Sequence, residues 1–309
     1  MSSPSSRYRV FSDEQWQRIE RLLPTNVGRR GHPFGEHRRV VEGIAYRYRA
    51  GIPWRDLPRD VFGPWQTVWK RHRRYAGDGT WDRVLAALLT DADAAGQIDW
   101  TVSVDATINR AHQHATNTTR PEQDTGAVSN YKNLPLVDAE PAGHGIGRSR
   151  DGLTTKIHHA VDGKGRPLAI VITGGQRNDG AVLEQVLADI RVPRRGRGRP
   201  RTRPDAVLAD KAYAAGITRR MLQRRGIKVV IPLKSDQIAA RKRKGSKGGR
   251  PPALDRQMYR ERNVVERSFA LIKQWRGLAT RYDKLAITYR AAVVLSACIV
   301  WNRLLEDTP

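Results

Sequence analysis

The spacing of apolar residues along the chain changes once, near residue 99. Before that point apolar positions recur every three or four residues, which is typical of helices that bury one face. Segments rich in glycine or proline separate these stretches, and Ser12 stands where an N-cap residue would begin the first of them. The pattern predicts helices over 13–24, 36–49, 64–75 and 81–95. Residues 1–95 are therefore expected to form a small all-helical domain.

After residue 99 the apolar residues alternate or form short runs, which is typical of strands. Strands are predicted over 101–105, 153–161, 167–173, 206–210 and 227–232, with a turn at 162–165. Helices are predicted over 179–190, 217–225, 257–275 and 285–305. Three neighbouring strands followed by alternating helices and strands indicate a mixed-sheet α/β domain over residues 96–309.

The chain is strongly basic, with 56 Lys and Arg against 31 Asp and Glu among its 309 residues and a formal net charge of +25. Such an excess favours a polyanionic partner. Two stretches, 194–203 and 241–250, each hold six basic residues among glycines, with a proline in the first. We expect both to be loops, because like charges at this density repel one another. They are either solvated linkers or contacts to nucleic acid, and the charge of the whole chain favours the second interpretation.

The cysteine count and the length of the apolar stretches indicate the cellular compartment. The single cysteine, Cys298, lies in an apolar run and excludes both an internal disulfide and a cysteine-rich zinc site. No apolar stretch approaches the roughly 18 residues that a membrane span requires, and the N-terminus has no apolar core. We expect a cytoplasmic protein that associates with the nucleoid.

The predicted helix over 64–75 carries candidate DNA contacts. Trp65, Val68 and Trp69 share one face by their spacing, and polar side chains occupy the rest. The candidates are Gln66, Lys70, Arg71, Arg73 and Arg74. A helix of this kind on a helical scaffold is typical of helix-turn-helix-like DNA readers. A solvated basic face on a core helix explains the same pattern, and the segment alone does not separate the two.

Two aspartates, Asp105 and Asp210, end predicted strands. Ligands of open α/β sheets generally bind beyond the carboxyl ends of strands. Either aspartate alone is explained as well by a turn or a helix cap.

The predicted helix over 257–275 adds a third carboxylate. Its residues Tyr259, Arg262, Glu266 and Lys273 fall within about 60° of one another at about 100° per residue. One face therefore carries a phenol, a guanidinium, a carboxylate and an ammonium group. The simpler alternative is a surface helix with an Arg262–Glu266 ion pair.

The order Tyr259, Arg262, Glu266, Lys273 resembles the signature of bacterial insertion-sequence transposases of the group numbered four and five, most closely the family-five type. The segments 104–115, 152–180 and 208–215 resemble the blocks of that group around its first aspartate, its strand pair and its second aspartate. Upstream, 51–58 and 62–75 resemble its helical N-terminal region. The resemblance thus covers nearly the whole chain.

The resemblance implies a ribonuclease-H-like catalytic domain whose triad is Asp105, Asp210 and Glu266. It implies a transposase that binds terminal inverted repeats as double-stranded DNA, cleaves it and joins it to target DNA, as a homodimer. Tyr259, Arg262 and Lys273 become candidates for DNA contacts. Three carboxylates without cysteine or paired histidine suit Mg²⁺ or Mn²⁺, and two such ions would clamp the attacking and leaving oxygens.

Other polar residues are expected to have different roles. Lys156, His158 and His159 lie on a predicted central strand and are interpreted as structural. A zinc site at His112 and His114 is not expected, because no third ligand follows. Only residues 233–256 fill the gap in which some relatives carry a β-rich insertion associated with hairpin chemistry, so that route is not carried over.

Two other functions fit parts of the pattern. A non-catalytic DNA-binding regulator would keep the helical region and the basic segments but has no need for all three carboxylates. A ribonuclease-H-like nuclease would cut without joining but has no need for an N-terminal DNA-reading domain. Both alternatives remain open at this point.

Overall fold

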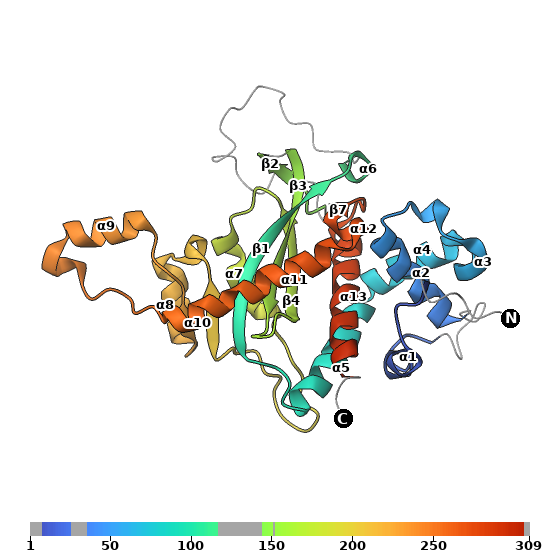
Figure 1. Cartoon of the computed structure of the whole chain (residues 1–309), viewed down its shortest axis with the longest axis horizontal. Coiled ribbons are helices and arrows are strands. Elements are labelled where there is room, and N and C mark those ends of the chain that lie inside the picture. The colour runs from blue at the N-terminus through green and yellow to red at the C-terminus, as the bar shows by residue number, and fades with distance from the viewer. Residues whose placement is uncertain (1–7, 26–35, 117–143, 151, 306–309) are drawn as a thin grey trace.

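The computed structural model describes residues 8–25, 36–116, 144–150 and 152–305. The first part of the chain is helical, as the apolar spacing predicted (Figure 1). Its elements are α1 (Asp13–Glu20), α2 (His37–Ala50), η2 (Trp54–Asp56), α3 (Arg59–Phe62), α4 (Trp65–Gly77) and α5 (Thr80–Ala94). Ser12 caps α1, because its side chain accepts a hydrogen bond from the Gln15 N–H while the Gln15 side chain accepts one from the Ser12 N–H.

The second part of the chain contains one mixed sheet. Its strands are β1 (Thr101–Ala111), β2 (Gly147–Ser149), β3 (Gly152–Val161), β4 (Pro167–Gly174), β5 (Ala206–Ala209), β6 (Lys228–Val230) and β7 (Thr280–Arg281). β3 pairs with β1 on one side and with β4 and the short β2 on the other, and all three pairings are antiparallel. β5 runs parallel to β1, and β6 runs parallel to β5. This order and direction of strands is ribonuclease-H-like, as the resemblance implied.

Helices and short turns surround the sheet. They are α6 (Gln113–Thr116), α7 (Asp179–Asp189), η3 (Lys211–Tyr213), α8 (Gly216–Arg224), α9 (Ser235–Arg243), η4 (Gly245–Gly248), α10 (Arg256–Arg260), η5 (Glu261–Asn263), α11 (Val264–Lys273), α12 (Arg276–Ala279) and α13 (Ala286–Leu304). α11 crosses the sheet, and α9 projects from the far end of the molecule (Figure 1). Within the described residues, no helix is long and apolar enough to cross a membrane.

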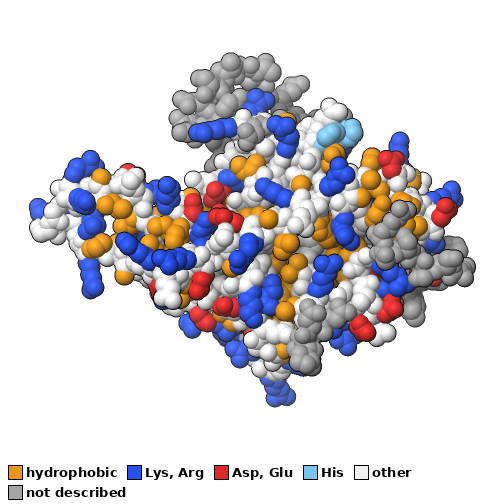
Figure 2. All heavy atoms as spheres, in the orientation of Figure 1, with side chains coloured by type: hydrophobic (Ala, Val, Ile, Leu, Met, Phe, Trp, Pro, Cys, Tyr) orange, Lys and Arg blue, Asp and Glu red, His pale blue; other side chains and the backbone are white. Residues whose placement is uncertain are grey.

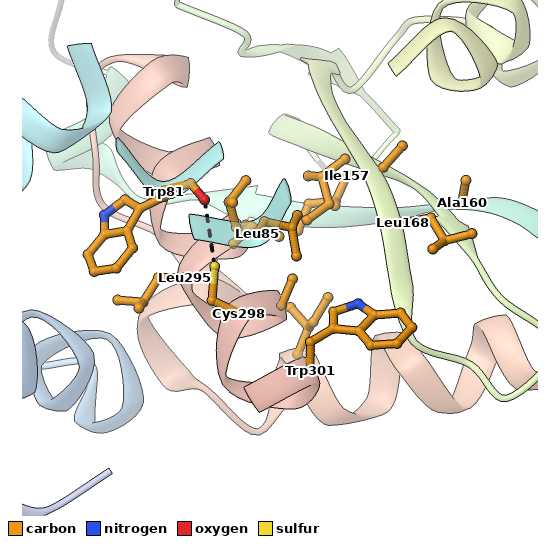
Figure 3. Packing of buried hydrophobic residues seen from close by; sticks show 14 of the residues in the cluster. Trp81, Leu85, Ile157, Ala160, Leu168, Leu295, Cys298 and Trp301 are labelled. Carbon is orange, nitrogen blue, oxygen red and sulfur yellow. Dashed lines mark hydrogen bonds between the residues drawn. The ribbon is translucent and has the colours of Figure 1, made fainter. Parts of the chain in front are cut away.

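The core joins the helical part to the sheet through α13 (Figure 3). Trp81 and Leu85 of α5 belong to the same buried cluster as Leu295 and Trp301 of α13. The Cys298 thiol lies 3.6 Å from the Trp81 carbonyl oxygen. The Trp301 indole N–H donates to the Pro167 carbonyl oxygen at the start of β4 (2.7 Å). The helical N-terminal region and the sheet therefore share one hydrophobic core.

Two segments differ from the sequence prediction near the expected site. β1 does not end at Asp105 but continues to Ala111, because its residues up to Arg110 pair with β3. The helix predicted over 257–275 is divided by the 3-10 turn η5 into α10 and α11. Asp105 consequently lies within a paired strand rather than at its end.

The two basic stretches also have more order than the predicted loops. Residues 241–243 form the last turn of α9, so the loop prediction for 241–250 was wrong at its start. The first glycine of this stretch is Gly245, which has a φ of 54°. The Arg and Lys residues before it are good helix formers, so they continue α9. In the stretch 194–203, Arg201 forms an isolated bridge with Val192, and its guanidinium lies 3.9 Å from the Trp100 ring centroid.

Candidate active site

The two predicted aspartates lie on neighbouring strands. β1 and β5 are parallel, and their register pairs Val104 with Ala209. Asp105 and Asp210 are the residues that follow Val104 and Ala209, so the register brings the first and second predicted carboxylates to adjacent positions. Asp210 also caps η3, because its carboxylate accepts a hydrogen bond from the Ala212 N–H (2.7 Å).

The predicted third carboxylate, Glu266, lies in the first turn of α11. α11 is fixed to the sheet because Val264, Val265 and Phe269 pack in one buried cluster with Val161 of β3. The Glu266 side chain remains 55% exposed. The apolar face thus fixes the helix on the sheet and leaves Glu266 accessible.

Arg262 connects two of the three carboxylates. Its Nη1 donates to Asp105 Oδ2 (2.9 Å), and its Nη2 donates to Glu266 Oε1 (2.5 Å). The Arg262 side chain is 16% exposed, and the Asp105 side chain is 24% exposed. Residues that lie 157 positions apart in the sequence are therefore in direct contact. The Arg262–Glu266 pair that the sequence suggested is present, and it extends to Asp105.

The arrangement also bears on a divalent metal. The three carboxylates provide the hard oxygen donors that Mg²⁺ and Mn²⁺ prefer. Within the part of the chain that the structure describes, however, no three Asp, Glu, His or Cys side chains converge closely enough to hold a metal ion. Arg262 takes one oxygen each from Asp105 and Glu266. The carboxylate oxygens suit such an ion, but in this structure Asp105 and Glu266 each accept a hydrogen bond from the Arg262 guanidinium.

Burial raises the pKa of the Asp105 carboxyl above its ordinary value, and the negative charge of Asp210 adds to the rise. Hydrogen bonding from the Ala106 N–H and the charge of Arg262 oppose it. Desolvation is the largest of these effects. A further positive charge near Asp105 would favour its ionised form.

The remaining residues of the predicted stripe do not all reach these carboxylates. Tyr259 packs against the buried cluster of Ala206, Leu208 and Val230 beneath β5 and β6. Lys273 is exposed at the end of α11. Seven residues of helix separate it from Glu266, a rise of roughly 10 Å. The stripe is therefore extended, with Arg262 and Glu266 as its contacting pair.

The residues of β3 behind Asp105 have structural partners. The buried Lys156 ammonium donates to Asp179 Oδ1 and to the Arg177 carbonyl oxygen (both 2.8 Å). His158 Nε2 is 2.8 Å from the Thr173 hydroxyl, and the His159 ring stacks on Phe269 at 5.2 Å. The structural interpretation of this strand is consistent with these contacts.

Sequence reasoning missed two residues that lie near the aspartates, Tyr213 and Asp179. Tyr213 is the last residue of η3, three positions after Asp210, and is buried. Burial raises the pKa of its hydroxyl, and the charges of Asp179, Asp105 and Asp210 raise it further. Gly180 allows η3 to approach α7, because an added Cβ would lie 3.3 Å from the Ala212 carbonyl oxygen. Both missed residues fall in the segments 152–180 and 208–215, which resembled family blocks, and that is the signal that could have identified them.

On α4, one of the predicted DNA contacts, Arg71, is buried. Arg71 is only 6% exposed, and its Nη1 lies 3.4 Å from the Tyr75 hydroxyl. Val68, Arg71, His72 and Tyr75 form the inward face, whereas Trp65 and Trp69 are only half-buried. Four candidates remain exposed, namely Gln66, Lys70, Arg73 and Arg74. Figure 2 shows Lys and Arg side chains scattered over the visible face of the molecule, including the projection that carries α9.

Two family models match the chain. The model described as "Putative transposase of IS4/5 family" matches residues 11–85, and the model described as "Transposase DDE domain" matches residues 96–302. The first match ends at residue 85, inside α5, and the second begins at residue 96, between α5 and β1. Together they cover most of the 309 residues.

Individual proteins are similar over shorter lengths. A protein described as "Putative transposase for insertion sequence element IS402", from Burkholderia cepacia, is 34% identical over 158 residues, which are 51% of this chain and 66% of that protein. The corresponding protein for IS6501, from Brucella ovis, is 29% identical over 49% of this chain and 100% of its own length. An uncharacterized protein, y4sN, from Sinorhizobium fredii is 37% identical over 35% of this chain and 82% of its own length.

Among solved structures, the Mos1 strand transfer complex matches over 88% of this chain and 81% of its own, at 13% identity and a TM-score of 0.25. The family membership does not depend on this likeness, because the DDE-domain model alone covers more than half of the chain. This chain belongs to the DDE transposases of bacterial insertion sequences, in the IS4/5 group.

Proposed function

We propose that this protein binds the terminal inverted repeats of an insertion sequence and catalyses metal-dependent cleavage of DNA strands and their joining to target DNA. The observation that carries the proposal is the contact of Arg262 with both Asp105 and Glu266, beside the strand-register neighbour Asp210. Arg262 thereby links Asp105 to Glu266, and the β1–β5 register puts Asp210 next to Asp105. The proposed setting is the cytoplasm, on nucleoid DNA.

Asp105, Asp210 and Glu266 are the residues that would hold Mg²⁺ or Mn²⁺, two ions in the proposed form. The ions would supply Lewis-acid activation of a phosphodiester. The protein's own contribution is to place the three carboxylates with rigid elements, since β1 and β5 are paired and α11 is packed on Val161. Rigid placement limits the reorganisation that the reaction requires.

Basic side chains are proposed to position the DNA. Arg262 offers donors to a phosphate beside the carboxylates, and Lys273 and Tyr259 offer donors farther along the same helical segment. On α4, the proposed contacts are the exposed Gln66, Lys70, Arg73 and Arg74. Phosphate contacts of this kind set affinity and register, whereas contacts to base edges set sequence preference. A homodimer that pairs two DNA ends is part of the proposal.

Amide variants of the triad test the proposal. Asp105→Asn, Asp210→Asn and Glu266→Gln keep side-chain size and remove one negative charge each. We expect cleavage and joining of a labelled terminal-repeat duplex with Mg²⁺ or Mn²⁺ to fall at least about a thousandfold, on the scale of losing a strongly charge-stabilising group. Binding of the duplex should persist in gel shifts. Glu184→Gln, an exposed change on α7, is the matched control and should retain activity.

The same assay separates the alternatives. Full activity in one amide variant would remove that residue from the triad. Cleavage without joined product in the wild type would indicate a nuclease. A wild type that binds the duplex but neither cuts nor joins it would indicate a DNA-binding regulator.

A further inference from the structure

The guanidinium of Arg262 stands where two proposed metal ligands meet. Each of its terminal nitrogens is bonded to a different carboxylate, Asp105 on β1 and Glu266 on α11. Among the described residues, these are the ion pairs found for Asp105 and Glu266. Arg262 is therefore the cation that the two carboxylates share.

This cation cannot be removed by deprotonation, because a guanidinium stays charged at any ordinary pH. A divalent ion that used the same carboxylate oxygens would lie within a few ångströms of the fixed positive charge and would be repelled by it. Metal binding at Asp105 and Glu266 thus requires the Arg262 side chain to move.

The local backbone favours such a movement. Arg262 is the middle residue of η5, a 3-10 turn between α10 and α11. A 3-10 stretch inside a longer helical segment often marks a hinge. α11 itself remains fixed by Val264, Val265 and Phe269, so Glu266 stays in place while the turn before it adjusts.

The charged residues around Arg262 indicate which ligand would bind its guanidinium in place of the carboxylates. Lys211, Arg267 and Lys273 are exposed on the elements that carry Asp210 and Glu266, and the chain as a whole carries a net charge of +25. Such a surface attracts DNA. Phosphate accepts two parallel hydrogen bonds from arginine, as a carboxylate does, so it can replace the carboxylates as partner.

We propose that Arg262 keeps Asp105 and Glu266 closed to divalent cations until a DNA phosphate takes over its guanidinium. The inference rests on the proposed function, since it concerns the same carboxylates. It adds that DNA and metal bind cooperatively, and the cooperativity is reciprocal: DNA strengthens metal binding by the same factor by which metal strengthens DNA binding. Metal loading, and with it cutting, would be limited to protein already on DNA.

The test measures Mn²⁺ binding to the full-length protein, by electron paramagnetic resonance of free Mn²⁺, with and without a short mixed-sequence duplex. Mn²⁺ bound by the duplex alone is measured separately and subtracted. For the wild type, we expect the duplex to tighten Mn²⁺ binding about tenfold or more, within the usual range of coupling between sites. Arg262→Gln should bind Mn²⁺ without DNA at least about tenfold more tightly than the wild type, and the duplex should add little.

Arg260→Gln is the matched control, because it removes one exposed arginine two residues earlier without touching either carboxylate. It should behave as the wild type. Equal or weaker Mn²⁺ binding by a folded Arg262→Gln would overturn the inference and make the bridge a purely structural tie. If that variant melts before it can be titrated, the wild type alone decides, since Mn²⁺ affinity independent of the duplex also overturns it.

Asp105→Asn separates this inference from the proposed function. If Asp105→Asn binds Mn²⁺ as the wild type does with DNA present, the assigned metal site is wrong and both fail. If Asp105→Asn loses Mn²⁺ while the wild type shows no dependence on DNA, the site stands and only the role of Arg262 fails.

Discussion

At the scale of single residues, buried polar groups differ in whether they are satisfied. The Tyr289 hydroxyl donates to the Leu278 carbonyl oxygen (2.5 Å) and accepts from the Asn109 side-chain amide (2.9 Å). The Tyr213 hydroxyl is equally buried but has no hydrogen-bond partner within the described part of the chain. An unsatisfied buried group costs free energy, whereas a satisfied one is expensive to remove.

Tyr213→Phe is therefore expected to leave the free energy of unfolding unchanged or to raise it by about 1 kcal/mol. Tyr289→Phe, the matched control, should lower it by ~1–3 kcal/mol, because it leaves buried partners unpaired. Urea unfolding at neutral pH measures both. A loss in Tyr213→Phe as large as that in Tyr289→Phe would show that the Tyr213 hydroxyl has a partner in solution.

At the scale of elements, α4 shows how one helix divides its arginines between two roles. Val68, His72 and Tyr75 face the core, and Arg71 lies among them at the same helical spacing. Its guanidinium lies 5.8 Å from the Tyr75 ring centroid, so both its charge and its aliphatic stem have neighbours. Arg73 points outward and lies over the half-buried Trp69.

Substitution with glutamine should separate these roles. Arg71→Gln is expected to lower the free energy of unfolding by ~1–3 kcal/mol, because it disturbs a buried, packed side chain. Arg73→Gln should change stability by less than about 0.5 kcal/mol. It should instead weaken duplex binding and reduce the salt slope of log K by about 0.9, the share of one phosphate contact. Melting curves and salt titrations check both. Identical binding and stability profiles for the two variants would contradict the division.

At the scale of the whole molecule, the shared core includes neutral histidines in both parts of the chain. Burial, the chief cause in each case, lowers the pKa of His72 to about 4, of His158 to about 4 and of His159 to about 3. His72 contacts Tyr48 of α2 and the Thr288 carbonyl oxygen of α13, so its protonation would disturb the junction between the two parts.

Acid should therefore destabilise the protein before most carboxylates titrate. In the unfolded chain a histidine has a pKa of about 6.5, so between about pH 6.5 and pH 4 the unfolded chain binds protons that the folded chain does not. The free energy of unfolding is expected to fall as the pH falls through that window, by up to ~1.4 kcal/mol per pH unit for each histidine.

Urea unfolding at several pH values from about 7 to about 5 measures this slope. His72→Gln should flatten it by up to ~1.4 kcal/mol per pH unit, whatever its effect on absolute stability. Equal slopes in the wild type and in His72→Gln would show that His72 protonates freely in the folded protein.

The sequence alone determined the features that depend on neighbouring residues. The Ser12 cap and the order of the main helices and strands follow from local spacing and turn chemistry. The acidic candidates Asp105, Asp210 and Glu266 were identified from motifs, and the structure places Asp105 in contact with the Arg262 that also bonds Glu266.

Only the tertiary structure decided which face of each element is buried and which distant residues meet. Periodicity shows that Val68 and Arg71 share a helix face, but packing against α2 and α13 decides that this face is inside. Likewise, pairing with β3 carries β1 beyond Asp105. The bridge from Arg262 to Asp105 joins residues 157 positions apart, a contact that no local pattern contains because its geometry depends on how α11 packs on the sheet.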